Sequence, residues 1–277
     1  MKYRVSCAIV ISITCLVAAC NKEVEEPKDD EENITIPAGT VDRSIIMTSS
    51  VLTREMHLSV YLPPGYDTSK ARYPVLYLLH GMWGNYIDWS NNGMAFILDN
   101  AIYSGKAKPM IVMMPDGLDA FYCNNYNNGT LKYEDYMTDE LFPYVDSHYR
   151  TRAESKNRAI AGLSMGGYGS TFHAFKRPHL FGSCYSMSGA LAMGSSAPDL
   201  QALINSKDAE ELLALPAYTM ECGTEDALVF NSNVQFDSFL TGKNISHTFI
   251  KRPGSHDWTF WMTCLPKAVE FVSKNFE

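Results

Sequence analysis

Short, uninterrupted runs of apolar residues recur along the chain and are separated by polar stretches or by segments of helical periodicity. The runs of strand length lie at residues 73–81, 109–117, 157–163, 181–189, 217–223 and 246–251. Continuous apolar runs are typical of strands whose two faces are both covered by helices. An earlier pair of segments, 45–48 and 55–62, is expected to form antiparallel strands before the Pro63-Pro64-Gly65 break.

Helical periodicity marks the segments between these runs. Helices are predicted at residues 94–103, 133–149, 167–176, 230–240 and 257–275. Pro143 should kink or break the second of them, because proline lacks the N–H that a helix interior uses. Strands that alternate with helices predict an α/β fold with a mostly parallel, doubly wound sheet and helices on both faces. Residues 188–216 leave room for a helix and a loop, but not for a bulky cap.

The first twenty residues differ from the rest. Lys2 and Arg4 precede an uncharged run from Val5 to Ala19, which is shorter than a membrane-spanning helix and fits an export signal. The run ends in "LVAAC", the pattern of a bacterial lipoprotein signal, so we predict that residues 1–20 are a signal peptide and that Cys20 is acylated.

An acidic segment follows the predicted lipid anchor. Residues 21–38 contain seven acidic residues and two lysines, which predicts a disordered tether before a single folded domain at 39–277. An acidic run after a lipidated cysteine resembles the surface-export signals of some bacterial lipoproteins, so we expect an exported lipoprotein of the outer membrane. The whole chain carries a net charge of −8, so its composition does not indicate a basic surface that would bind nucleic acid.

A glycine-rich turn follows the apolar run at 157–163. It reads Gly162-Leu163-Ser164-Met165-Gly166, the G-x-S-x-G pattern, between a predicted strand and a predicted helix. Glycines two residues before and after the serine permit a turn sharp enough to lift the side chain clear of the backbone. We therefore predict that Ser164 is a nucleophile.

A serine hydroxyl becomes a good nucleophile only when a base takes its proton, and in this context the acid and the histidine should follow the serine. Of the seven histidines, His247 and His256 lie far enough downstream. His247 falls inside a predicted strand, whereas His256 lies in a glycine-containing loop before the last helix. We therefore predict His256 as the base.

The acid that orients this base should also follow a strand. Asp226 does so in "ECGTEDAL", and Glu225 is the adjacent alternative. The remaining downstream aspartates fall in a polar connection, in a helix or at a helix start: Asp199, Asp208, Asp237 and Asp257. We therefore predict Asp226 as the orienting acid.

The negative oxygen formed in such a reaction needs two N–H donors. One should be the backbone of Met165, directly after the nucleophile, and the other should come from Gly81 or Met82 after the run at 73–81. His80 in the same loop could be a ligand or a base, but a role in shaping the loop through packing and hydrogen bonds is the better interpretation.

Five segments, in order and spacing, resemble the esterase D-like group of α/β-hydrolases. They are "VYLPPGY", "YPVLYLLHGMWGN", "AGLSMGGYG", "CGTED" and "GSHDWTFW". The group includes the feruloyl and acetyl-xylan esterases of carbohydrate esterase family 1, S-formylglutathione hydrolases and short-chain esterases. The resemblance covers about residues 44–276, and it implies an α/β-hydrolase fold with little or no cap.

The resemblance also implies roles for individual residues. Ser164 would be the nucleophile, Asp226 and His256 its partners, and the amides of Met82 and Met165 the oxyanion hole. A carboxylic ester hydrolase that removes feruloyl or acetyl groups from plant polysaccharide is therefore the first hypothesis. The alternatives are a general short-chain acyl or siderophore esterase and a non-catalytic surface glycan-binding protein on the same fold.

Aromatic residues are the candidates for substrate contact. Trp83 lies next to the predicted oxyanion loop, and Phe121 and Tyr122 follow a strand, so these three are predicted to form a pocket wall. Trp258 and Trp261, spaced i, i+3 on the last helix, are expected in the core instead.

The predicted partners are an ester substrate, with acylated xylan or an oligosaccharide as candidates, and the membrane through the lipid anchor alone. No cofactor is expected. The sequence has neither C-x-x-C nor H-E-x-x-H spacing, so no metal site is predicted.

Overall fold

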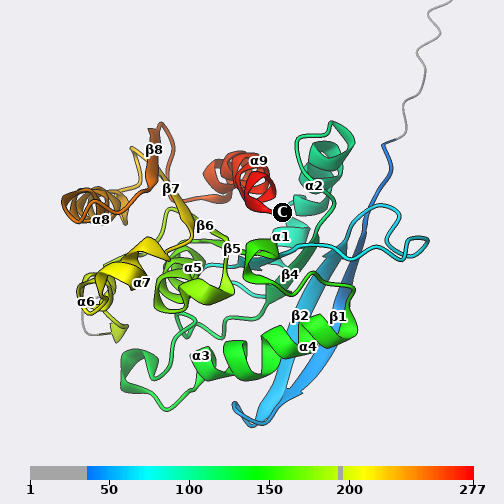
Figure 1. Cartoon of the computed structure of the whole chain (residues 1–277), viewed down its shortest axis with the longest axis horizontal. Helices are drawn as coiled ribbons and strands as arrows, with labels where there is room; N and C mark the ends of the chain where they lie inside the picture. Colours follow the sequence, from blue (N-terminus) through cyan, green and yellow to red (C-terminus); the bar gives the residue numbers. More distant parts are fainter. Residues whose placement is uncertain (1–35, 193–195) are drawn as a thin grey trace, which may run out of the picture. The chain divides into compact units, whose positions relative to one another are not determined.

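The protein is described by a computed structural model that covers residues 36–192 and 196–277. The predicted signal peptide, Cys20 and the tether as far as residue 35 lie outside the described residues. One sheet runs through the folded part, in the strand order β1-β2-β4-β3-β5-β6-β7-β8 (Figure 1). The strands are β1 (Thr40–Ser49), β2 (Arg54–Leu62), β3 (Val75–Leu79), β4 (Ile111–Pro115), β5 (Arg158–Leu163), β6 (Ser183–Met187), β7 (Ala217–Gly223) and β8 (Thr248–Arg252).

The sheet is parallel except at one edge. β2 pairs antiparallel with both β1 and β4, and all pairs from β4 to β8 are parallel. The prediction of an antiparallel opening pair followed by a parallel sheet is confirmed. β1 is longer than the predicted segment 45–48, because its pairing register shifts between Asp42 and Ile45 and this irregularity interrupts the simple alternation of side chains.

Apolar side chains fill both faces of the central strands. On β3, Val75, Tyr77 and Leu79 join one buried cluster, while Leu76 and Leu78 join the other. Because successive side chains of a strand point to opposite faces, a strand buried on both sides must be apolar throughout. This burial explains why the sequence shows continuous runs here rather than alternation.

Helices cover the two faces as predicted. α2 and α9 belong to the cluster on one face, and α4, α5 and α8 to the cluster on the other (Figure 1). The helices are α1 (Asp88–Asn91), α2 (Met94–Tyr103), α3 (Tyr133–Asp135), α4 (Phe142–His148), α5 (Met165–Lys176), α6 (Leu200–Asn205), α7 (Ala209–Leu213), α8 (Phe230–Gly242) and α9 (Trp258–Asn275).

The predicted helix at 133–149 is divided by a wider helical turn. α3 is followed by a π-helical segment, Tyr136–Leu141, and then by α4, in which Pro143 occupies the first turn. A proline inside a regular α-helix leaves the carbonyl four residues earlier without a donor and collides with it, and the wider turn before Pro143 accommodates both effects.

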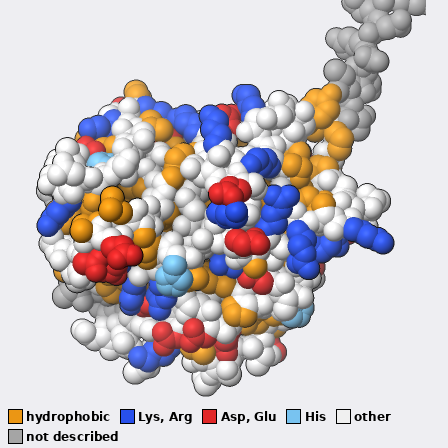
Figure 2. Space-filling model, in the orientation of Figure 1, with side chains coloured by type: hydrophobic (Ala, Val, Ile, Leu, Met, Phe, Trp, Pro, Cys, Tyr) orange, Lys and Arg blue, Asp and Glu red, His pale blue; other side chains and the backbone are white. Residues whose placement is uncertain are grey.

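Among its described residues, the connection between β6 and β7 contains two short helices, α6 and α7, whereas the sequence predicts one helix and a loop. Within the described residues, no helix combines the length and the apolar character needed to cross a bilayer. On the face seen in Figure 2, Lys and Arg side chains lie beside Asp and Glu side chains over much of the surface.

Candidate active site

Four loops that follow parallel strands meet at the carboxyl edge of the sheet. Ser164 follows β5, the segment from His80 to Met82 follows β3, Asp226 lies three residues after β7, and His256 lies four residues after β8. Ligands bind at this edge in open α/β sheets, because the loops there are free to vary while the strands hold their ends in place. The tertiary structure therefore gathers residues that are up to 176 positions apart in the chain.

Ser164 occupies a strained turn between β5 and α5. Its backbone has φ 53° and ψ −114°, a region that residues with a side chain rarely adopt. The turn is tight because a Cβ at Gly162 would collide with the backbone of Gly166, and a Cβ at Gly166 would lie 2.5 Å from the carbonyl oxygen of Leu79. Both glycines of the G-x-S-x-G pattern are thus required by close backbone contacts.

A continuous chain of contacts links Ser164, His256 and Asp226. The Ser164 Oγ lies 2.9 Å from His256 Nε2, and His256 Nδ1 lies 2.7 Å from Asp226 Oδ2. An ionised carboxylate only accepts hydrogen bonds, so Nδ1 carries the proton and donates to Asp226. Nε2 is then free to accept from the serine hydroxyl.

Asp226 is almost completely buried, yet it is held as a carboxylate. Burial opposes its ionisation, but the hydrogen bond from His256 and the backbone N–H of Val229 outweigh burial and keep the pKa of Asp226 below its ordinary value. The N–H groups of Leu228 and Val229 both donate to Oδ1, each at 3.1 Å. Oδ2 is therefore left to orient the imidazole.

The other candidate acids and base have different contacts. The carboxylate of Glu225 accepts the backbone N–H of Gly254, and Asp257 caps α9 by accepting the N–H of Phe260 at 2.9 Å. His247 Nε2 lies 3.0 Å from Asp237. Asp199 and Asp208 cap the short helices α6 and α7.

The two predicted oxyanion donors lie beside the serine. Met165 is the first residue of α5, where backbone N–H groups have no intrahelical acceptor, and Met82 lines the cavity next to Ser164. Within the described part of the chain, the N–H of Met82 donates no hydrogen bond. Both amides are therefore available to an oxygen atom bound above Ser164.

His80 braces the loop that carries Met82. Its Nε2 accepts the N–H of Gly117 at 2.7 Å, and its Nδ1 lies 2.7 Å from the carbonyl oxygen of Gly81. Burial lowers the pKa of His80, so the ring is neutral, with its proton on Nδ1. That proton is donated to the carbonyl of the same peptide unit that presents the Met82 N–H.

A cavity of about 520 Å³ opens next to the serine and the histidine. Its lining is mainly apolar, with aromatic side chains from three segments: Trp83, Phe121, Trp258 and Trp261. Trp83 stands at the rim with 90% of its surface exposed, and the exposed Leu228 also lines the cavity. A planar or apolar ligand group could therefore be covered on several sides.

The prediction that Tyr122 lines the pocket is wrong. The side chain is fully buried, its hydroxyl donates to the His80 carbonyl at 3.0 Å, and its ring packs against Gly117 and Gly169. Its neighbour Phe121 does line the cavity. Both residues have positive φ angles, so the regular alternation of a strand does not apply to them.

Trp258 and Trp261, which the sequence predicts in the core, also line the cavity. Trp261 is mostly buried and its ring lies edge-on to His256, with 5.0 Å between ring centroids, while Trp258 packs edge-on against Trp89. Both lie within five residues of His256 in the sequence, and this proximity could have indicated that they line the cavity. Asp88 lines the same cavity, and no sequence pattern predicted this position.

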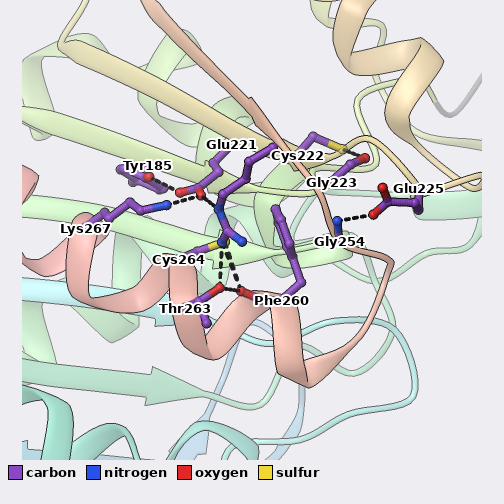
Figure 3. Close-up of polar contacts among 11 residues, drawn as sticks. Tyr185, Glu221, Cys222, Gly223, Glu225, Gly254, Phe260, Thr263, Cys264 and Lys267 are labelled. Carbon is purple, nitrogen blue, oxygen red and sulfur yellow. Dashed lines mark hydrogen bonds and ion pairs between the residues drawn. The ribbon is translucent and has the colours of Figure 1, made fainter.

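An ion cluster around the buried carboxylate of Glu221 anchors the loop that carries His256 (Figure 3). Glu221 on β7 accepts hydrogen bonds from Arg252 on β8, from Lys267 on α9 at 2.6 Å and from Tyr185 at 2.5 Å. Burial opposes ionisation of Glu221, but these hydrogen bonds outweigh it and lower its pKa. Arg252 also donates to Thr263 on α9 at 2.7 Å, so both ends of the His256 loop are tied together.

Comparison with known proteins identifies one family and several relatives. A family model described as "Putative esterase" matches residues 49–272. The chain is 39% identical over 228 residues to an endo-1,4-beta-xylanase/feruloyl esterase of Xylanibacter ruminicola, covering 78% of this chain but only 29% of that protein. It is 28% identical over 237 residues to an acetyl esterase of Caldicellulosiruptor saccharolyticus, covering 75% of this chain and 86% of that protein.

A solved structure of a ferulic acid esterase superposes with a TM-score of 0.80 at 27% identity, over 87% of this chain and 99% of that chain. The chain thus spans less than a third of the xylanase/feruloyl esterase and nearly the whole of the solved esterase. The predicted α/β-hydrolase fold is confirmed by this superposition.

Proposed function

This chain belongs to the esterase family, and from that membership we propose that it is a serine carboxylic ester hydrolase. Ser164 is the nucleophile, His256 the general base and Asp226 the acid that orients the base. The observation that carries the proposal is the chain of contacts from Ser164 Oγ through the imidazole to Asp226, at 2.9 and 2.7 Å, beside a cavity large enough for an ester.

The first half of the reaction forms an acyl-enzyme. His256 Nε2 takes the proton of the Ser164 hydroxyl while Oγ attacks the carbonyl carbon of the ester. The resulting oxyanion accepts hydrogen bonds from the N–H groups of Met82 and Met165. His256 then gives its proton to the alkoxide that leaves, and the acyl group remains on Ser164.

The second half releases the acyl group. His256 takes a proton from water, the hydroxide attacks the acyl carbon, and the proton passes to Ser164 Oγ as the acid departs. Throughout, the carboxylate of Asp226 stabilises the positive charge that the imidazole acquires and keeps its proton on Nδ1.

The proposed substrate is a polysaccharide that carries hydroxycinnamoyl groups such as ferulate. Trp83, Phe121, Trp258 and Trp261 offer aromatic surface to the acyl ring. Stacking of this kind adds about 0.5–1.5 kcal/mol beyond the buried area, which is roughly a 2- to 13-fold preference over an aliphatic acyl group. Similarity to an endo-1,4-beta-xylanase/feruloyl esterase and to a solved ferulic acid esterase supports this choice.

Removal of acetyl groups is the second candidate. The relative named acetyl esterase aligns over 86% of its own length, and the arrangement around Ser164 suits a small acyl group equally well. The two candidates differ in their contact with the aromatic side chains that line the cavity. A hydroxycinnamoyl ring can stack on these side chains, whereas an acetyl group is too small to do so.

We also propose that the enzyme is attached to the outer membrane through acylated Cys20 and faces the outside of the cell. The sequence "LVAAC" and the acidic residues that follow it support this placement. A tethered enzyme at the cell surface could meet polymeric esters that do not cross the membrane.

The test is a comparison of kcat/KM for methyl ferulate, acetylated xylan, an aryl acetate and an aryl butyrate with the purified protein. Trp83→Ala should lower the ferulate-to-acetate ratio, whereas Leu213→Ala, which changes an exposed side chain outside the cavity, should leave it unchanged. The hydroxycinnamoyl assignment fails if methyl ferulate is a much poorer substrate than a matched alkyl acetate. It also fails if Trp83→Ala leaves the ratio unchanged.

A further inference from the structure

Asp88 is the one carboxylate among the described residues that line the cavity next to Ser164. It is the first residue of α1 and lies in the segment that follows the oxyanion loop. The other lining residues are apolar or neutral, apart from the imidazole of His256. Asp88 is half-buried, so its carboxylate is partly removed from water among mainly apolar neighbours, and such a group gains from a hydrogen-bond donor.

The carboxylate of Asp88 is only partly satisfied. Oδ2 accepts the backbone N–H of Asn85 at 3.2 Å and lies against Gly84, where a Cβ would displace it. No ion pair and no bond to Oδ1 is formed within residues 36–192 and 196–277. The neighbouring His80 is neutral, so it does not balance the charge. One oxygen of Asp88 therefore remains able to accept a hydrogen bond from a ligand.

This charge also opposes the chemistry proposed for the cavity. The reaction develops a negative oxygen at the amides of Met82 and Met165, and a half-buried carboxylate in the same cavity disfavours that charge. A substrate group that donates a hydrogen bond to Asp88 would disperse the carboxylate charge and remove part of this penalty. A substrate without such a donor would leave Asp88 desolvated and unpaired.

We propose that Asp88 is a specificity residue that selects esters bearing a hydroxyl group, which donates to its carboxylate. The proposal rests on the proposed esterase function and specifies its substrate class. The hydroxyl can belong to the phenol of a hydroxycinnamoyl group or to the sugar.

The experiment uses two matched pairs of substrates with the full-length protein. The first pair is methyl ferulate and methyl 3,4-dimethoxycinnamate, which differ only in the phenolic hydroxyl. The second is an acetylated arabinoside and the same ester with its free hydroxyls methylated. For each pair, kcat/KM of the hydroxyl-bearing substrate is divided by kcat/KM of its methylated partner. This ratio is measured for the unchanged protein, for Asp88→Asn and for Asp88→Ala.

A hydrogen bond to a charged group contributes about 1.5–3 kcal/mol, so Asp88→Ala should lower at least one ratio by roughly 10- to 100-fold. Asp88→Asn keeps an acceptor oxygen without the charge and should lower the same ratio less. Asp67→Asn removes the same charge at an exposed position outside the cavity and should leave both ratios unchanged. The pair whose ratio falls identifies the source of the hydroxyl.

Unchanged ratios in both Asp88 variants overturn the proposal, whatever happens to the absolute rates. If these variants do not fold, binding to Ser164→Ala provides the test. In at least one pair, the hydroxyl-bearing ester should bind roughly 10-fold or more tightly than its methylated partner. Equal affinities in both pairs overturn the proposal. Poor hydrolysis of all hydroxycinnamates by the unchanged protein would defeat the acyl assignment alone, since the sugar pair still tests Asp88.

Discussion

Glu225 and Gly254 are bonded to each other in both directions. The N–H of Glu225 donates to the carbonyl oxygen of Gly254 at 3.1 Å. The N–H of Gly254 donates in return to the Glu225 carboxylate, as Figure 3 shows. Asp226 directly follows the first residue, and His256 lies two residues after the second. This reciprocal contact therefore sets the spacing between the loops that carry the acid and the base.

Replacing Glu225 by Ala should lower kcat by about 10- to 100-fold with little change in KM, because a displacement of about 1 Å between reacting groups costs on that order. Glu225→Gln keeps an acceptor for the Gly254 N–H and should recover most of the lost activity. Steady-state kinetics of the two variants test the contact. Equal losses in both would contradict a positioning role.

Ser164→Ala and His256→Ala should each reduce turnover by about 10⁴- to 10⁶-fold without loss of the fold, and the double variant should lose little more than either. The reason is that the two side chains act as one unit in moving a proton. Turnover of an aryl acetate, together with circular dichroism, provides the measurement. Losses that multiply in the double variant would show that the residues act independently.

The buried carboxylate of Glu221 should make the fold sensitive to acid. Its pKa in the folded protein is lowered from the ordinary value of 4.5, so the ionised form stabilises the fold above pH 4.5. This contribution is lost as the pH falls through the folded-state pKa. Glu221→Gln should therefore reduce the free energy of unfolding at pH 7 by about 1–3 kcal/mol.

Denaturant unfolding between pH 3 and pH 7 checks both the size and the pH dependence of this effect. Glu221→Gln should flatten the fall in stability below pH 4.5, whereas Glu210→Gln, at an exposed carboxylate, should not. A variant as stable as the unchanged protein across the whole range would refute the assignment.

Gly166→Ala should destabilise the fold by about 1–3 kcal/mol, because a Cβ there would lie 2.5 Å from the Leu79 carbonyl oxygen and 2.6 Å from that of His80. Gly242→Ala is the matched control, since a Cβ at that position meets nothing within 4 Å. Melting temperatures of the two variants provide the comparison. If Gly166→Ala melts no lower than Gly242→Ala, the turn is looser than its geometry implies.

If Cys20 carries the proposed lipid anchor, Cys20→Ala should abolish acylation and leave the protein either unprocessed or released in soluble form, because attachment would then depend on the lipid rather than on the apolar run. Fractionation of cells and mass spectrometry of the N-terminus test this. Processed Cys20→Ala protein that stays in the membrane fraction would require another anchor. Protease added to intact cells should cut the tether only if the domain faces outward.

The sequence alone predicted the parallel sheet, the principal helices and the pairing of Ser164 with His256. Strands buried on both faces must be apolar throughout, and the G-x-S-x-G turn requires two glycines because its backbone segments touch, so both features are visible as local patterns. His256 and Asp226 could be selected because residues that follow parallel strands meet at one edge of the sheet.

The lining of the cavity was decided by the tertiary structure. Phe121 faces the cavity and Tyr122 the core, although both have positive φ angles in one irregular loop that follows no period. Trp258 and Trp261 contact both the core and the cavity, and i, i+3 spacing cannot separate the two. The contacts of Glu225 and the position of Asp88 in the cavity depend on how loops from different strands pack against each other. No local sequence pattern predicts this packing.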